Sequence, residues 1–271
     1  MFGRKRFSFN DIPDLTGKVA IVTGANSGIG YVTARELARK NAHVIVCSRS
    51  IERGQTAVNK IKTETNNEEV EVLQLDLVDW KGTKDAADSF VARKLPVNNA
   101  GIMATSYELN EHGIEKQFAT NHVGHFVFTK TLLPVIEASA PSRIVNIASG
   151  FHKRAPNGIN FDDINLEKES VWARYGTVAT NIAHGFIAEN GVLAKIAFNL
   201  IGIFAMNEDD GALTQLYVAT SPEIEKENYR AKYFVPFAKL ETPKPFATNQ
   251  ETASRLWKWT EEFLNEKLGI F

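Results

Sequence analysis

The sequence predicts an α/β domain in which helices cover both faces of a parallel β-sheet, a doubly wound arrangement. In the first half of the chain, short apolar runs alternate with longer segments whose apolar residues follow a helical period. The runs are almost continuously apolar, as expected for strands that are covered by helices on both sides. No linker or repeat divides the 271 residues, so we predict a single domain over residues 1–271.

The individual elements can be placed in order along the chain. Strands are expected at residues 18–23, 43–47, 70–75, 143–148 and 231–237. Helices are expected at residues 28–40, 51–65, 80–93, 191–206, 209–220 and 252–267. One or two more helices are expected within residues 111–138, where Pro134 should kink the second, and residues 161–167 are expected to form a loop.

The composition excludes several classes of function. The 31 basic and 32 acidic residues nearly cancel, which argues against nucleic-acid or anionic-membrane binding as the main role. The single cysteine, Cys47, excludes a disulfide framework and a cysteine-rich metal site, so we predict no metal. It also fits a reducing compartment, and we expect a cytoplasmic protein. No run reaches the ~18 apolar residues of a membrane span.

The amino-terminal residues 1–14 are expected to form a flexible segment. They are basic but contain no apolar core of the kind that a secretory signal has. A second interpretation is that the basic residues 4–6, which lie between Phe2 and Phe7, contact a membrane surface peripherally.

The strongest local motif is Thr-Gly-Ala-Asn-Ser-Gly-Ile-Gly at residues 23–30, between the first strand and the first helix. Glycines at such a turn permit a positive φ and let backbone N–H groups approach a phosphate closely. The helix that follows adds the positive end of its dipole. The motif therefore predicts a nucleotide diphosphate site, and the alternative is a glycine-rich turn without a ligand.

This motif resembles the T-G-x-x-x-G-x-G turn of the short-chain dehydrogenase/reductase family, and four further segments match that family in order. They are Asp76-Leu77, Asn98-Asn99-Ala100-Gly101, the segment around Asn121, and Ser149 with the later Tyr175. Residues 177–181 resemble the segment after the family's sixth strand. The resemblance covers residues 15–268 and implies a Rossmann-like fold and a nicotinamide-dependent oxidoreductase.

The resemblance also implies roles for single residues. The catalytic set is Tyr175 as the proton donor or acceptor, Ser149 at the carbonyl oxygen and Asn121 at a water of the proton relay. The implied cofactor contacts are Gly24, Asn26, Ser27, Gly28, Ile29, Gly30, Ser48, Arg49, Asp76, Leu77, Asn99, Ala100, Gly101 and Thr180. Asp76 is placed near the adenine and Thr180 at the nicotinamide amide.

The substrate class and the coenzyme can be narrowed further. Residues 211–222 and Tyr233-Phe234 resemble the retinol-dehydrogenase-like subgroup, and the apolar residues 191–206 lie where the family carries its substrate lid. We therefore expect a small hydrophobic carbonyl or alcohol, such as a retinoid, steroid or lipid aldehyde; the alternative is that residues 191–206 form an ordinary core helix. The second strand ends at Ser48-Arg49 instead of at a carboxylate. A guanidinium pairs well with a 2′-phosphate, so NADP(H) is favoured over NAD(H), unless Arg49 is only a surface charge.

The sequence departs from the family pattern at two places. The position four residues after Tyr175, where the family carries a lysine, holds Ala179. Between Tyr175 and Thr180 there is no room for the rest of a helix and a strand, because a parallel crossover needs at least a dozen residues. We therefore predict that the sixth strand and most of its preceding helix are missing, and we expect only a stub of strand before Asn98.

These departures leave three hypotheses. The first is an NADP(H)-dependent oxidoreductase that acts on a hydrophobic alcohol or carbonyl. The second is a catalytically impaired relative that still binds a dinucleotide. A tyrosine hydroxyl titrates near pKa ~10, and a neighbouring cation such as the family's lysine lowers that pKa by about 1–3 units. Without the lysine, the tyrosine would be a poorer acid–base catalyst. The third is a shortened product of a normal enzyme gene. Without the sixth strand, the strand expected at 231–237 would lack its ladder partner. The family's oligomeric state cannot be carried over either, because the missing helix often forms part of its dimer interface.

Overall fold

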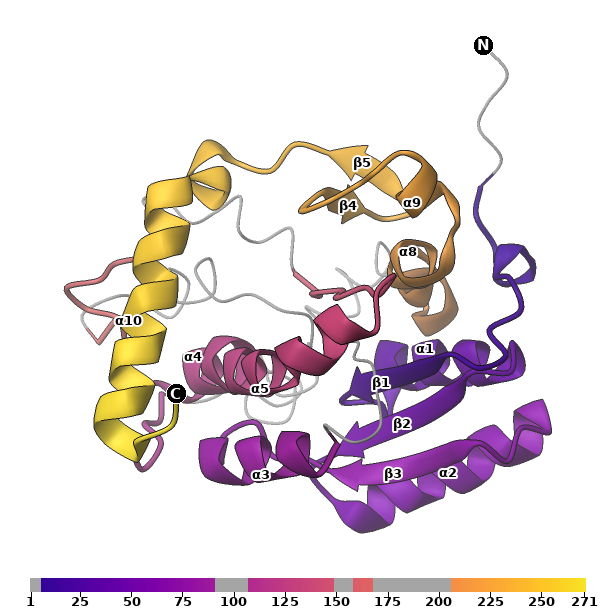
Figure 1. Cartoon of the computed structure of the whole chain (residues 1–271), viewed down its shortest axis with the longest axis horizontal. Coiled ribbons are helices and arrows are strands. Elements are labelled where there is room, and N and C mark those ends of the chain that lie inside the picture. Colours follow the sequence, from indigo (N-terminus) through magenta and orange to yellow (C-terminus); the bar gives the residue numbers. More distant parts are fainter. Residues whose placement is uncertain (1–5, 91–106, 149–157, 168–205) are drawn as a thin grey trace, which may run out of the picture.

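The computed structural model describes residues 6–90, 107–148, 158–167 and 206–271, which Figure 1 shows in colour. In chain order the elements are η1 (Phe9–Asp11), β1 (Val19–Thr23), α1 (Gly28–Arg39), β2 (His43–Ser48), α2 (Ile51–Thr65), β3 (Val70–Gln74), α3 (Trp80–Phe90), α4 (Lys116–Phe118), η2 (Ala119–Gly124), α5 (His125–Ala138), α8 (Glu208–Thr220), α9 (Glu223–Lys226), β4 (Tyr233–Val235), β5 (Lys239–Glu241), η4 (Pro245–Thr248) and α10 (Gln250–Leu268).

The first three strands form a parallel sheet in the order β1-β2-β3. Val19 pairs with His43 at the start of the β1–β2 ladder, and Val44 pairs with Val70 at the start of the β2–β3 ladder. Helices connect the strands, as right-handed parallel crossovers require. The predicted α/β fold with a doubly wound sheet is confirmed for this part of the chain.

Helices cover both faces of this sheet, because successive side chains of a strand point to opposite faces. Val44 and Val46 of β2 pack into one buried cluster with residues of α1, α2 and α8. Ile45 and Cys47 pack into a second cluster with residues of α3 and α5. The two layers of helices explain why the strands read as continuous apolar runs in the sequence.

Two glycines allow helices to approach the sheet closely. A Cβ at Gly54 of α2 would lie 2.5 Å from a methyl group of Val72, and a Cβ at Gly124 would lie 2.7 Å from Leu77 Cβ and closer still to its carbonyl oxygen. A side chain at either position would therefore push its helix away from the sheet.

The region predicted to hold one or two helices within residues 111–138 differs from the expectation. Residues 111–115 form a turn, helical structure begins at Lys116, and a π-helix, η2, lies between α4 and α5. Pro134 lies inside α5, which continues to Ala138. Residues 191–205 of the helix predicted at 191–206 and the stub of strand expected before Asn98 lie outside the described residues, and Met206 lies outside any helix.

The strand predicted at residues 143–148 is only partly confirmed. Its single ladder position is an isolated bridge at Asn146. Val145 is buried and Ile147 packs against the same cluster as α1 and α8. The segment therefore follows the path of a strand along the core without forming a ladder within the described residues.

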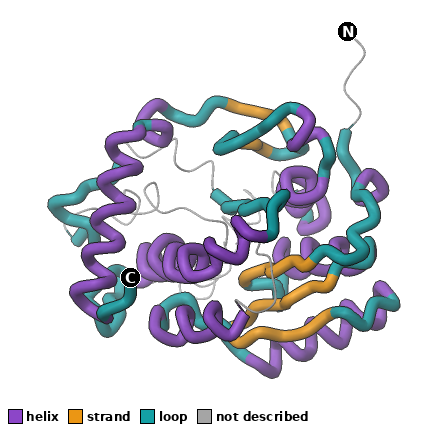
Figure 2. Tube along the Cα trace, in the orientation of Figure 1, coloured by secondary structure: helices purple, strands orange, loops and turns teal. Residues whose placement is uncertain are grey.

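The carboxyl-terminal strand has a partner that sequence reasoning did not foresee. The predicted strand at 231–237 is shortened to β4, which pairs with β5 as an antiparallel hairpin, with Phe234 opposite Leu240. Figure 2 shows this hairpin apart from the parallel sheet. The expectation that this strand would lack a ladder partner was therefore wrong, because β5 satisfies one of its edges.

The remaining termini pack onto these layers. Leu264 of α10 is fully buried in a third cluster with residues of η2 and α5. Residues 6–14 belong to the segment that we expected to be flexible, yet Ile12 is buried in the main core and the Arg6 guanidinium pairs with Asp210. Within the described residues, no helix combines the length and the apolar character that crossing a membrane requires.

Candidate functional site

The glycine-rich turn leaves β1 and leads directly into α1. Gly24 and Gly28 adopt φ values of +63° and +59°, which residues other than glycine rarely adopt. The Ala25 N–H donates to the Cys47 carbonyl at 3.1 Å and so holds the turn against the end of β2. The sequence prediction that these glycines serve a tight turn at a helix start agrees with this geometry.

The amino terminus of α1 differs from those of three other helices in its capping. Ser50, Asn207 and Asn249 each accept a backbone N–H at the start of α2, α8 and α10. The corresponding residue of α1, Ser27, makes no side-chain capping bond. The first N–H groups of a helix have no partner inside that helix. The start of α1 therefore presents backbone donors and a positive dipole end that suit an anion.

The end of β2 lies beside this turn and carries the predicted coenzyme-selecting residues. Ser48 is buried and donates through its hydroxyl to the Ser50 carbonyl at 2.9 Å. Arg49 is exposed, and its guanidinium makes no ion pair with any residue of the described ranges. Its charge is thus free to meet a second anionic group.

The end of β3 supplies the third set of predicted contacts. One carboxylate oxygen of Asp76 accepts the Val78 N–H at 3.1 Å, which orients the side chain. Leu77 is buried against Gly124 of η2. The carboxyl ends of β1, β2 and β3 therefore bring the glycine-rich turn, Arg49 and Asp76 to one edge of the sheet, where ligands of open α/β sheets bind.

Asn121 lies in the middle of the π-helix η2. Single-turn π segments are rare and occur frequently at functional sites. The Asn121 carbonyl is 3.3 Å from His125 Nδ1, and His125 Nε2 is 3.3 Å from the Thr23 hydroxyl, directly before the turn. The π-helix thus connects Asn121 to the end of β1 through one imidazole.

Two histidines of this region are residues that sequence reasoning did not assign. Burial lowers the pKa of His125 to about 4, and burial together with the neighbouring His125 lowers the pKa of His122 to about 4. Both imidazoles are therefore neutral at neutral pH. His122 Nε2 is 3.0 Å from the Thr260 hydroxyl of α10. The repeated histidines around Val123 and Gly124 were the available signal, and their burial was not readable from the sequence.

The other predicted site residues cannot be placed. Ser149, Tyr175, Asn99, Ala100, Gly101 and Thr180 lie outside the described residues, as does Ala179. The described part brings together the turn at residues 24–30, Ser48, Arg49, Asp76, Leu77 and Asn121. By its geometry this part can hold a nucleotide with a diphosphate at the start of α1.

Comparisons with known proteins place this geometry in context. A family model described as short chain dehydrogenase matches residues 18–159. An uncharacterized oxidoreductase from Schizosaccharomyces pombe is 37% identical over 86% of this chain and 81% of its own length. Mouse retinol dehydrogenase 12 is 32% identical over 92% of this chain and 87% of its own. A solved structure from Mycobacterium paratuberculosis has a TM-score of 0.72 at 28% identity and covers 96% of this chain and 97% of its own.

The alignments with the relatives are longer than the parts of this chain that they cover. The alignment with the S. pombe protein runs over 274 residues, although 86% of 271 is only about 233. The alignment with retinol dehydrogenase 12 runs over 280 residues, although 92% of 271 is about 249. These relatives thus carry roughly 30 to 40 residues without a counterpart here. That length agrees with a missing strand and most of a helix.

Proposed function

Since the chain belongs to the short-chain dehydrogenase/reductase family, we propose that it is an NADP(H)-dependent oxidoreductase acting on a hydrophobic alcohol or carbonyl. The observation that carries the proposal is the uncapped start of α1 behind two glycines of positive φ. The substrate class rests on the similarity to retinol dehydrogenase 12 and on the apolar residues 191–206.

The described residues fit a dinucleotide with a 2′-phosphate. The diphosphate would accept hydrogen bonds from the backbone N–H groups of residues 28–30, and the glycines leave space for it. Arg49 pairs with the 2′-phosphate, because its guanidinium is exposed and makes no ion pair within the described ranges. In this proposal the Asp76 carboxylate, which the Val78 N–H orients, bonds the adenine.

In the proposed reaction, the bound coenzyme supplies or takes a hydride at the carbonyl carbon of the substrate. Tyr175 donates the proton to the carbonyl oxygen in the reducing direction and takes it back in the other. Ser149 holds that oxygen by a hydrogen bond, and Asn121 holds a water that links the tyrosine to solvent. The π-helix and the neutral His125 fix the position of Asn121.

A second candidate function is dinucleotide binding without turnover. It is favoured by Ala179 at the position of the family's lysine and by the extra residues of the relatives. The resemblance implies that the family's lysine lowers the pKa of its tyrosine, and this chain lacks that lysine four residues after Tyr175. General acid–base catalysis contributes roughly 10²–10⁴ in rate, so most of that factor would be lost.

Coenzyme binding tests what the two candidates share. Gly28→Ala should abolish NADPH binding measured by isothermal titration calorimetry, because a side chain at the φ of +59° strains the turn that the diphosphate would approach. Gly17→Ala is the matched control, since Gly17 has a φ of +75° and lies in a different turn. Both variants should lose about 1–2 kcal/mol of stability. Equal NADPH affinity in the two variants would show that the glycine-rich turn does not bind the coenzyme.

Turnover separates the candidates. Purified protein is mixed with NADPH and a panel of aliphatic and retinoid aldehydes, and the nicotinamide absorbance is followed. Oxidoreductase activity that disappears in Tyr175→Phe supports the first candidate and the assigned proton donor. Tight NADPH binding with no absorbance change for any aldehyde supports the second. Turnover that survives in Tyr175→Phe would show that another group moves the proton.

A further inference from the structure

The two histidines of the segment that joins η2 to α5 contact different parts of the molecule. His125 Nε2 is 3.3 Å from the hydroxyl of Thr23, the last residue of β1, and His122 Nε2 is 3.0 Å from the Thr260 hydroxyl of α10. Thr23 is fully buried and directly precedes Gly24, the first glycine of the proposed diphosphate turn. His125 therefore contacts the coenzyme side of the site, and His122 contacts the carboxyl-terminal helix.

The partners of His125 fix its tautomer. A backbone carbonyl only accepts hydrogen bonds, so His125 Nδ1, at 3.3 Å from the Asn121 carbonyl oxygen, carries the hydrogen. In a neutral imidazole the other nitrogen is then an acceptor, and the Thr23 hydroxyl donates to it. One ring thus holds a backbone group of Asn121 with one nitrogen and the end of β1 with the other.

His122 carries its hydrogen on the opposite nitrogen. The Thr260 hydroxyl donates to the Leu256 carbonyl at 2.7 Å, so its oxygen accepts from His122 Nε2–H. This imidazole therefore joins η2 to α10 and contacts Thr260 where His125 contacts Thr23. Because the two histidines lie three residues apart in one segment, His122 is an internal reference for His125.

Side-chain donors also serve the carbonyl groups of the π-helix. The His125 backbone N–H donates to the His122 carbonyl, whereas in a regular α-helix it would donate to the carbonyl of Asn121. The Asn121 carbonyl accepts from the His125 ring. At the start of the same segment, the Ala119 carbonyl accepts from the buried Trp80 indole N–H at 3.3 Å. The irregular turn that carries Asn121 is thus held by side chains, one of which also reaches β1.

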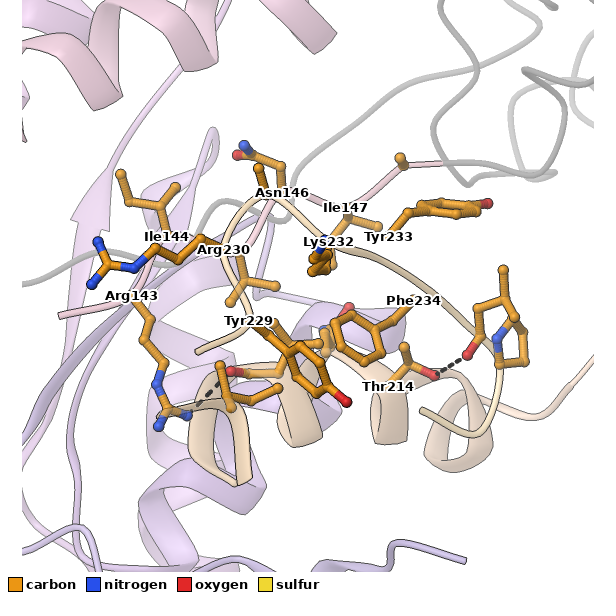
Figure 3. Close-up of a pocket in the computed structure, with 18 of the residues that line it drawn as sticks. Arg143, Ile144, Asn146, Ile147, Thr214, Tyr229, Arg230, Lys232, Tyr233 and Phe234 are labelled. Atoms are coloured by element: carbon orange, nitrogen blue, oxygen red, sulfur yellow. Dashed lines mark hydrogen bonds between the residues drawn. The ribbon is translucent and has the colours of Figure 1, made fainter. Parts of the chain in front are cut away.

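These contacts are separate from the cavity of about 540 Å³ that Figure 3 shows between residues 142–148, α8 and residues 229–236. Thr23, Asn121 and His125 are not among the described residues that line it. A substitution at His125 therefore changes no side chain of this lining.

We propose that His125 is a positioning residue that couples coenzyme binding at the glycine-rich turn to the placement of Asn121. The inference rests on the proposed function, because it requires a diphosphate at residues 24–30. A coenzyme that orders the turn holds Thr23, and the rigid imidazole transmits this constraint to the Asn121 carbonyl. Coupling between two sites is reciprocal, so loss of the imidazole weakens coenzyme binding.

NADPH affinity of the full chain, measured by isothermal titration calorimetry, tests the coupling. His125→Phe keeps a flat ring but removes both nitrogens, so the affinity should fall about three- to tenfold, the value of about one hydrogen bond. His122→Phe is the matched control, since it removes a similar imidazole from the same segment, and its affinity should equal that of the wild type. His125→Gln keeps a donor and an acceptor and should recover most of the lost affinity.

A double-mutant cycle isolates the contact between His125 and Thr23. Thr23→Val removes the hydroxyl at nearly constant volume. The losses of NADPH affinity in Thr23→Val and in His125→Phe should not add in the double variant, because both remove the same hydrogen bond. Thermal unfolding checks that each variant folds.

A spectroscopic signature separates positioning from a purely structural role. In ¹⁵N NMR spectra of the imidazoles, His125 should show the Nδ1–H tautomer and His122 the Nε2–H tautomer, each assigned from its glutamine variant. Addition of NADPH to the wild type should shift both nitrogen signals of His125 and leave those of His122 in place. These shifts test the coupling even where a phenylalanine variant does not fold.

The outcomes distinguish this inference from the function on which it rests. A folded wild type that binds no NADPH removes the proposed function, and the coupling is lost with it. If the wild type binds NADPH but the His125→Phe and His122→Phe variants bind it equally well, the coupling is wrong and the proposed function stands. Fully additive losses in the cycle, an Nε2–H tautomer at His125, or His125 signals that NADPH leaves unchanged would overturn the coupling in the same way.

Discussion

The strands of the amino-terminal unit, residues 19–74, and the strand of the carboxyl-terminal part, residues 233–235, complete their ladders in different ways. β2 pairs along its whole length with β1 and β3, and helices bury both of its faces. β4 pairs only with β5, over three residues, and all three are half-buried. β2 therefore has a ladder partner on both sides, while β4 has one ladder partner, β5, among the described residues.

The proposed coenzyme contacts at residues 24–49 and the proposed proton donor Tyr175 lie in different parts of the sequence. The turn, the start of α1 and Arg49 depend on β1, β2 and their helices, which are all in place. The proposed chemistry needs Tyr175, which directly precedes the region where the family's sixth strand is missing from the sequence. Changes in the two regions should consequently affect different measurements.

The largest effect is expected where η2 packs against the segment that follows β3. A methyl group in Gly124→Ala would overlap the backbone of Leu77, which cannot turn aside, so we expect a loss of at least about 3 kcal/mol in urea unfolding. Gly82→Ala is the matched control, because its methyl group meets only the carboxylate of Asp79, which can rotate. It should stay within about 1 kcal/mol of the wild type. Equal losses would mean that η2 does not pack closely against Leu77, in the segment after β3.

The same contrast shows what the sequence could reveal. The bounds of α2 follow from local periodicity and from Ser50 before it, and the structure places that helix at the predicted residues 51–65. The strands β1 and β2 were predictable because both of their faces are buried, which makes each a nearly continuous apolar run. The hairpin partner β5 was not predictable, since Lys239, Leu240 and Glu241 carry no strand pattern and pair with β4 only in the folded chain.

Some functional residues could be predicted from the local sequence, whereas others depend on tertiary packing. The glycine-rich turn and Arg49 could be located because short sequence patterns identify both of them. The burial of His122 and His125 depends on how α10 and β1 pack around η2, which no local pattern encodes. The uncapped state of Ser27 was equally hidden, because a serine before a helix normally predicts a cap.

The next largest effect should lie in coenzyme choice and leave the carboxyl-terminal part unchanged. Arg49→Ala removes a charge-assisted hydrogen bond of about 1.5–3 kcal/mol, so NADPH affinity should fall roughly 10- to 100-fold while NADH affinity stays the same. Lys81→Ala, which removes an exposed charge from α3, is the control. Parallel fluorescence titrations with both coenzymes measure the ratio. A fall for both coenzymes together would contradict a contact to the 2′-phosphate.

A pH dependence of stability should follow from the two buried histidines that connect the regions. Their pKa values of about 4 lie below the unfolded value of about 6.5. Between these values the unfolded chain binds more protons, so stability falls as the pH drops from 6.5 towards 4. Each histidine contributes a slope of up to about 1.4 kcal/mol per pH unit. His122→Gln or His125→Gln should flatten the dependence in urea unfolding, and an unchanged slope in both would contradict the burial.

The smallest effect compares the start of α1 with that of α2. Ser50 accepts the Arg53 N–H at 3.2 Å, so Ser50→Ala should cost about 1 kcal/mol in unfolding free energy. Ser27 makes no such bond, and Ser27→Ala should cost only a few tenths of a kcal/mol without coenzyme. The reason is that the Ser27 side chain accepts none of the backbone N–H groups at the start of α1. Losses of the same size at both serines would show that α1 is capped like the other helices, and the distinction between an open and a closed helix start would then disappear.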